Sequence, residues 1–161
     1  MSLSTLPIAL RDGVEAALSR RATRSVEILG AEPVSGGCIH QTARVSTTLP
    51  EDFFLKWAQG PPSDIFAAEA DGMNALHAST HGSTRDSPDL TVPEVIGYAG
   101  AGESPSWLLL EYIPCGSPAA DSPERLGEAL AILHEPGEGP YGWHRSNYIG
   151  SLPQTNAPMD D

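Results

Sequence analysis

The order of strand-like and helix-like segments constrains the fold of this chain more than any other feature of its sequence. Five short segments are rich in β-branched, aromatic or alternating apolar residues, a pattern typical of strands: 26–29, 39–47, 53–58, 92–98 and 107–112. One longer segment separates the third from the fourth, and its apolar residues Phe66, Ala70, Met73 and Leu76 recur at helical spacing. The order predicts an α+β fold with a five-stranded antiparallel sheet and one main helix.

Two further helices flank this arrangement in the sequence. Apolar residues between Leu6 and Leu18 predict an opening helix that ends near Arg20 and Arg21. A third helix is predicted from Ser122, whose hydroxyl is expected to cap it, with Pro123 in its first turn. The main helix is expected to be capped by Ser63 or Asp64, and the tail after His134 is expected to be mostly loop.

Charge and composition restrict the partners. The formal net charge is −12, from 21 acidic and 9 basic residues, which argues against general binding to nucleic acid or to anionic membranes. It also repels ATP at long range, so a nucleotide site would have to be local. The sequence has no membrane-spanning stretch and no signal-peptide pattern, so we expect a cytoplasmic protein in which Cys38 and Cys115 are free thiols.

Lys56 is the single lysine of the chain, in the apolar strand segment Phe-Phe-Leu-Lys-Trp. It follows a glycine pair, Gly36 and Gly37, and precedes Glu69 on the main helix. A glycine loop, a strand lysine and a helix glutamate in this order form the phosphate-binding half of a kinase site. Each residue also has a simpler interpretation. The glycines would form only a hairpin turn, and Glu69 would then be an ordinary surface residue. Lys56 would be a lysine with a solvated ammonium group, and a GC-rich genome would explain why lysine is so scarce.

Segments along nearly the whole chain resemble the fructosamine kinase (ketosamine 3-kinase) family, a branch of the protein-kinase-like phosphotransferases. The matching segments are VSGGCI (34–39), FLKW (54–57), FAAEADGM (66–73), VPEV (92–95), LLEYI (109–113), LGEALAILH (126–134), YG (141–142), NYIG (147–150) and QTN (154–156). The resemblance implies a kinase-like amino-terminal lobe over residues 1–112. Residues 113–161 would be the hinge and the first helix and loop of an incomplete carboxy-terminal lobe.

The resemblance also implies a set of ATP-binding residues. The backbone around the glycine pair would cover the phosphates, Lys56 would bind the α- and β-phosphates, and Glu69 would hold Lys56 in place. The hinge would offer backbone groups to adenine, although an edge strand is the alternative there. The implied nucleotide-binding residues are Ser35, Gly36, Gly37, Cys38, Ile39, Lys56, Glu69, Glu111, Tyr112 and Ile113.

Two further sites are implied by the same resemblance. Cys38 would be a redox-sensitive thiol able to link two subunits, unless it only fills a hairpin. Tyr141, Trp143, Asn147 and Tyr148 would shape the pocket for the sugar amine, or pack against the second lobe. His40 departs from the asparagine that many relatives carry.

The carboxylates that perform phosphoryl transfer in such kinases are expected beyond residue 161. The segment His144-Arg145-Ser146-Asn147 resembles a catalytic loop, but serine stands where a carboxylate is required. We therefore expect no catalytic residue and no Mg²⁺ ligand in this chain, and no kinase activity from the chain alone. Its surface toward a second lobe should be apolar and could support a dimer.

The sequence thus predicts ATP-dependent phosphorylation of ketosamines on glycated amines or proteins, with this chain supplying the ATP-phosphate half of the site. One alternative is a non-catalytic nucleotide-binding or interaction module. Another is an acidic α+β domain whose glycines only form turns.

Overall fold

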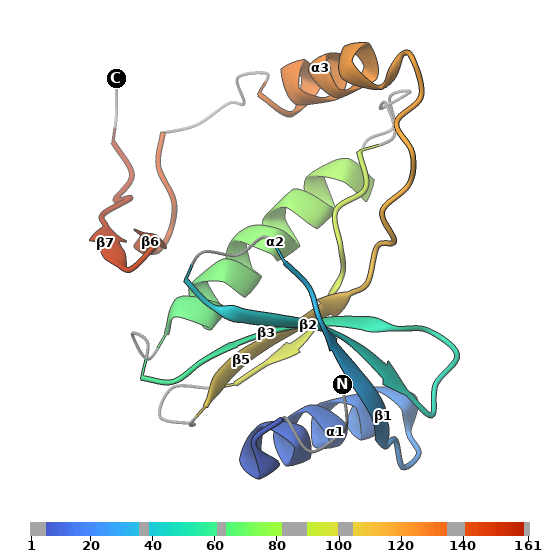
Figure 1. Cartoon of the computed structure of the whole chain (residues 1–161). Coiled ribbons are helices and arrows are strands. Elements are labelled where there is room, and N and C mark those ends of the chain that lie inside the picture. The colour runs from blue at the N-terminus through green and yellow to red at the C-terminus, as the bar shows by residue number, and fades with distance from the viewer. Residues whose placement is uncertain are drawn as a thin grey trace.

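The computed structural model describes residues 6–35, 39–60, 64–81, 90–99, 105–134 and 141–159. The chain forms three helices and seven strands within these ranges (Figure 1). In chain order they are α1 (Ile8–Ala22), β1 (Ile28–Pro33), β2 (Gln41–Thr47), β3 (Phe53–Ala58), α2 (Ile65–His81), β4 (Val95–Tyr98), β5 (Ser106–Glu111), α3 (Ser122–Leu133), β6 (Asn147–Ile149) and β7 (Leu152–Gln154).

The first five strands form one antiparallel sheet in the order β1-β2-β3-β5-β4. Strand β3 is central, and its Lys56 is paired with Thr42 on β2 and with Leu108 on β5. Strand β1 begins two residues later than the segment 26–29 predicts. The reason is that side chains of α1 bind the backbone just before this strand. The Val26 N–H donates to Ser19 Oγ, and the Ile28 N–H donates to Glu15 Oε1.

Helix α1 covers one face of the sheet. The odd-numbered positions of β3 point toward it, and Leu55 is fully buried there. Trp107 on β5 also faces α1, where Gly13 leaves room for the indole: a Cβ on Gly13 would lie 3.1 Å from Trp107 Nε1. The core on this face also includes Leu10, Val14, Leu18, Ile28, Val45, Phe53, Trp57 and Leu109.

Helix α2 covers the opposite face (Figure 1). Phe66 and Ala70 are each 1% exposed and pack with Leu108 and Leu110 of β5 in a second, smaller core. Helices α1 and α2, of 15 and 17 residues, thus lie on opposite faces of the sheet, and α1 confirms the opening helix predicted near the amino terminus. The even-numbered residues of β3, Lys56 among them, face α2.

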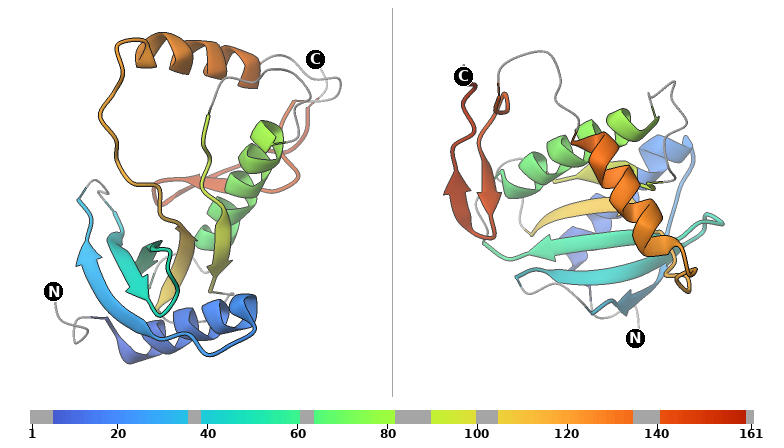
Figure 2. Two further views of the ribbon diagram at one scale, coloured as in Figure 1. Left: turned by 90° about the vertical axis from the view of Figure 1, so that its right-hand side faces the viewer. Right: turned by 90° about the horizontal axis from the view of Figure 1, so that it is seen from above.

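Helix α3 lies apart from the sheet, and the β6–β7 hairpin lies beside the amino-terminal half of α2 (Figure 2). The predicted cap on α3 is wrong. Asp121 is the N-cap residue and makes no side-chain cap, whereas Ser122 Oγ accepts a hydrogen bond from the Ala119 N–H. The hairpin was also missed, although Gly150-Ser151 between Ile149 and Leu152 is a two-residue turn signal.

None of the helices in the described ranges combines the length and the apolar content that crossing a membrane requires.

Candidate functional site

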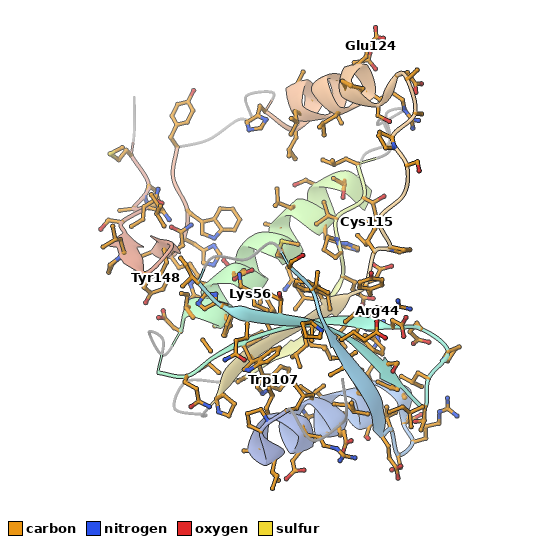
Figure 3. All side chains as sticks on the ribbon, in the orientation of Figure 1. Arg44, Lys56, Trp107, Cys115, Glu124 and Tyr148 are labelled. Carbon is orange, nitrogen blue, oxygen red and sulfur yellow. The ribbon has the colours of Figure 1, made fainter. Side chains whose placement is uncertain are left out.

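Lys56 and Glu69, which are expected to pair, are in contact in the structure. Lys56 Nζ donates to both carboxylate oxygens of Glu69, each at 2.8 Å. The alternation of β3 directs Lys56 toward α2 (Figure 3), and its contact with Glu69 shows that this glutamate projects from α2 toward the sheet. The side chains are 24% and 33% exposed, so the pair is partly shielded from water and still accessible.

Two aromatic rings lie beside this pair. Lys56 Nζ is 5.9 Å from the centre of the Phe66 ring, and the His40 ring centre is 5.0 Å from the same ring. Burial, and secondarily the positive charge of Lys56, holds the pKa of His40 below its usual 6.5, although Glu69 acts in the opposite direction. The imidazole is therefore predominantly neutral at neutral pH.

A cavity of about 480 Å³ opens between the sheet, α2 and the tail. Lys56 and Glu69 lie in its wall, which also includes the residues just after the glycine pair and the start of β6. The lining residues are Ile39, His40, Thr42, Lys56, Ile65, Ala68, Glu69, Gly72, Met73, Leu76, Asn147, Tyr148 and Gly150.

The tail also contacts Asp64, which lies just before α2 and was not predicted to be a site residue. The Tyr148 hydroxyl donates to Asp64 Oδ1, and Arg145 Nη2 lies 3.1 Å from Asp64 Oδ2. The hydrogen bond from Tyr148 holds the pKa of Asp64 below 3.8, and the same bond raises the pKa of Tyr148 above 10.0. The partners are more than 80 positions apart, so no local sequence signal marks this contact.

Asn147 contributes an acceptor to this region. Its side-chain oxygen is buried and has no hydrogen-bond partner within the part of the chain that the structure describes. Close by, Gly150 has a φ of +64° and its backbone approaches the side chain of Ile39, so a Cβ there would lie 3.1 Å from Ile39 Cδ1. The tail therefore packs closely on the residues that follow the glycine pair.

The predicted phosphate loop is only partly described. Ser35 is exposed, and Ile39 is 60% exposed at the cavity. Gly36, Gly37 and Cys38 lie outside the described residues, so the loop and the redox proposal for Cys38 stay predictions.

The predicted hinge lies elsewhere on the sheet. Glu111 and Tyr112 line a separate cavity of about 380 Å³. The Glu111 N–H already donates to the Glu94 carbonyl at 2.9 Å, because Glu111 still belongs to the sheet. Arg44 lies 5.0 Å from the centre of the Tyr112 ring, and Ile113 is 40% exposed. The structure thus separates these hinge residues from the Lys56 cavity.

The four predicted sugar-pocket residues also divide. Asn147 and Tyr148 line the Lys56 cavity. Trp143 instead donates from Nε1 to Asp71 Oδ2 at 2.7 Å, and Tyr141 forms an isolated bridge with Met159 and is 64% exposed. The structure therefore brings two of the four residues, Asn147 and Tyr148, to the Lys56 cavity.

The described ranges contain no cluster of three or more His, Cys, Asp or Glu side chains that could hold a metal ion.

Comparison with known proteins identifies the family. The sequence model of the fructosamine kinase family matches residues 11–161. A protein of Synechocystis named "Probable ketoamine kinase slr1563" is 32% identical over 144 residues, which are 89% of this chain and 45% of that protein. A chloroplastic protein-ribulosamine 3-kinase of Oryza sativa subsp. japonica is 28% identical, over 83% of this chain and 36% of its own length.

Solved structures agree with this result. The crystal structure of a "putative fructosamine-3-kinase" from Haemophilus somnus 129PT superposes with a TM-score of 0.73 at 24% identity, over 91% of this chain and 46% of that one. A similarly named protein from Thermobifida fusca gives 0.66 at 26% identity, over 92% and 47%. This chain spans less than half the length of these relatives. By the family match over residues 11–161, the chain belongs to the fructosamine kinase family.

Proposed function

We propose that this chain supplies the ATP-phosphate half of the site of a kinase that phosphorylates ketosamines. The observation that carries the proposal is the contact of Lys56 with both oxygens of Glu69 in the wall of an open cavity. On this proposal residues 1–112 are a kinase-like amino-terminal lobe. Residues 113–161 are the hinge and the beginning of a second lobe.

The geometry of the pair suits a phosphate ligand. An ammonium group has three donors, and Glu69 takes two of them, which leaves one N–H for a phosphate oxygen. The carboxylate also keeps the lysine in one orientation, so less side-chain entropy is lost on binding. A hydrogen bond between charged groups contributes about 1.5–3 kcal/mol, which offsets part of the repulsion from a net charge of −12.

ATP is the cofactor that these residues fit, because they offer a fixed cation beside a cavity. ATP would supply the phosphoryl group. Mg²⁺, on this proposal, would be held by the second lobe and not by residues of this chain. The chain's own contribution is to bind and orient the phosphates through Lys56, which Glu69 holds in position.

The substrate class follows from family membership together with the tail. Relatives carry the names ketoamine kinase and ribulosamine 3-kinase. Asn147 and Tyr148 of the tail line the same cavity as Lys56, so this part of the tail would lie beside a sugar amine bound there. The substrates would be small ketosamines or glycated proteins.

The remaining partner proposals come from the sequence. Binding to nucleic acid or membrane is not expected, and a cytoplasmic location stays a prediction. Self-association could use Cys38 or the apolar side of α3, where Leu126 and Leu130 are 50% and 41% exposed.

Calorimetric titration of the chain with ATP and Mg²⁺ tests the nucleotide half. Lys56→Ala should weaken binding at least tenfold. Lys56→Arg keeps the charge but not the compact ammonium, and should recover only part of the affinity. Equal affinity in all three proteins would rule out the role of Lys56.

Phosphoryl transfer needs a second measurement. The chain joined to the carboxy-terminal half of a ketoamine kinase relative should release ADP only when a ketosamine is present, and much more slowly with Lys56→Ala. ATP binding without ketosamine-dependent ADP release would favour the alternative, a nucleotide-binding module.

A further inference from the structure

Helix α2 carries two aspartates that the proposed nucleotide site does not use. Asp64 immediately precedes the helix, and Asp71 lies two turns further along on the same side. Glu69, the partner of Lys56, lies between them in sequence. It projects about 140° around the helix axis from Asp64, toward the sheet.

Residues 143–148 of the tail, here called the strap, bind both aspartates. Trp143 Nε1 donates to Asp71 Oδ2 at 2.7 Å, and His144 Nε2 lies 3.3 Å from the same oxygen. Tyr148 and Arg145 bind the two oxygens of Asp64. The strap thus attaches to α2 on both sides of Glu69 along the helix.

The opposite side of α2 is attached to the sheet. Phe66, which projects about 160° around the helix axis from Asp64, and Ala70 are buried against Leu108 and Leu110. The Tyr148 side chain packs against this same cluster while its hydroxyl reaches Asp64. An outward movement or rotation of α2 would therefore have to break the bonds to the strap.

We propose that the strap positions α2 so that Glu69 holds Lys56, with Asp64, Asp71, Trp143 and Tyr148 as positioning residues. This inference rests on the proposed function for its consequence, which is a coupling. Asn147 and Tyr148 line the same cavity as Lys56, so a molecule that displaces the strap also changes the support of the phosphate-binding pair. The strap links the expected sugar-amine side of the site to its ATP side.

The single lysine allows a direct test. Lysine labelled with ¹³C at Cε gives one side-chain NMR signal in this chain, that of Lys56. Its position would be compared in the wild-type chain, in Glu69→Gln, where the ion pair is broken, and in the double variant Trp143→Phe/Tyr148→Phe. Tyr98→Phe is the matched control, because it removes the hydroxyl of a 45% exposed tyrosine on β4, outside the strap and the proposed site.

The double variant should move the Lys56 signal at least half of the way toward its position in Glu69→Gln. It should also weaken ATP binding roughly threefold to tenfold, the effect of losing one or two hydrogen bonds. Tyr98→Phe should leave both unchanged. If the double variant does not fold, as judged by circular dichroism, Tyr148→Phe alone is used with the same expected direction.

An unchanged Lys56 signal in a folded strap variant would overturn the proposal, as would an equal shift in Tyr98→Phe. The NMR measurement needs no nucleotide. If wild-type chain fails to bind ATP, the proposed function loses its support, while the Lys56 signal still decides whether the strap positions the pair.

Discussion

Gly13 on α1 and Trp107 on β5 meet so closely that a Cβ on the glycine would lie 3.1 Å from the indole Nε1. The indole is 4% exposed and lies between α1 and the sheet (Figure 3), so it has little room to move away. This contact sets how near α1 approaches the sheet.

Gly13→Leu should therefore lower the free energy of unfolding by about 1–3 kcal/mol. The larger side chain would overpack this contact and force either α1 or the Trp107 indole to shift. Urea denaturation followed by circular dichroism measures this. Gly127→Ala on α3 is the control: a Cβ there meets nothing within 4 Å, so the substitution should stabilise the helix by up to about 1 kcal/mol. A neutral Gly13→Leu would show that α1 adapts without cost.

Phe66 joins α2 to the sheet and also contacts the site. Phe66→Ala should destabilise the chain by about 3–5 kcal/mol, since the side chain is 1% exposed and its removal leaves a cavity. Leu76→Ala, one of the same predicted apolar stripe but 39% exposed, should cost much less. Similar losses for both variants in urea denaturation would contradict the assignment of Phe66 to the core.

His40 should titrate below pH 6.5 because burial and Lys56 both disfavour its charged form. NMR of the histidine Cε1 protons measures this, with His40→Gln identifying the signal. Lys56→Met should raise the pKa of His40, and so should added ATP, whose phosphates favour the cation. Arg44→Met, which removes a cation further along the sheet, should leave the pKa of His40 unchanged. A His40 pKa above 6.5 in the chain without ATP would contradict the burial of its imidazole.

The bond between Asp64 and Tyr148 should depend on pH at both extremes. The pKa of Asp64 is lowered below 3.8, so the stabilisation is complete above that value and is lost as pH falls through the folded-state pKa. The pKa of Tyr148 is raised above 10.0, so the stabilisation is present below 10.0 and is lost as pH rises further. The Tyr148 ring signals, followed by NMR, should stay constant between these limits.

Asp64→Asn should remove the acid transition of those ring signals, and other tyrosines provide the reference. A transition near neutral pH would mean that another group controls the contact.

The parts of this structure that were predictable depend on local pattern. Strand β3 has the bounds expected for it, because the alternation of Phe53, Leu55 and Trp57 with partly exposed residues is unambiguous. The contact of Lys56 with Glu69 is what the resemblance to the fructosamine kinase family implies, whereas local pattern alone leaves Glu69 as an ordinary surface residue of a helix.

The remainder depends on contacts between distant segments. Nothing near Asp64 or Asp71 in sequence indicates that Tyr148 or Trp143 will bind them, and an aspartate before a helix is ordinarily taken for a cap. The β6–β7 hairpin was overlooked because its strands have three residues each and one contains Pro153. Ser122 failed as a cap because Asp121 already occupies the N-cap position.

The strap is synthesised long after α2. Asp64 and Tyr148 are 84 positions apart, so at a synthesis rate of about 5–20 residues per second roughly 4–17 s pass between their translation. In the later part of that interval, once β5 has been made, α2 can rest on the sheet through Ile65, Phe66 and Ala70, with its outer side unsupported. A nascent chain thus passes through a stage in which the sheet is formed and Lys56 is present, but the helix that holds it has only one of its two attachments.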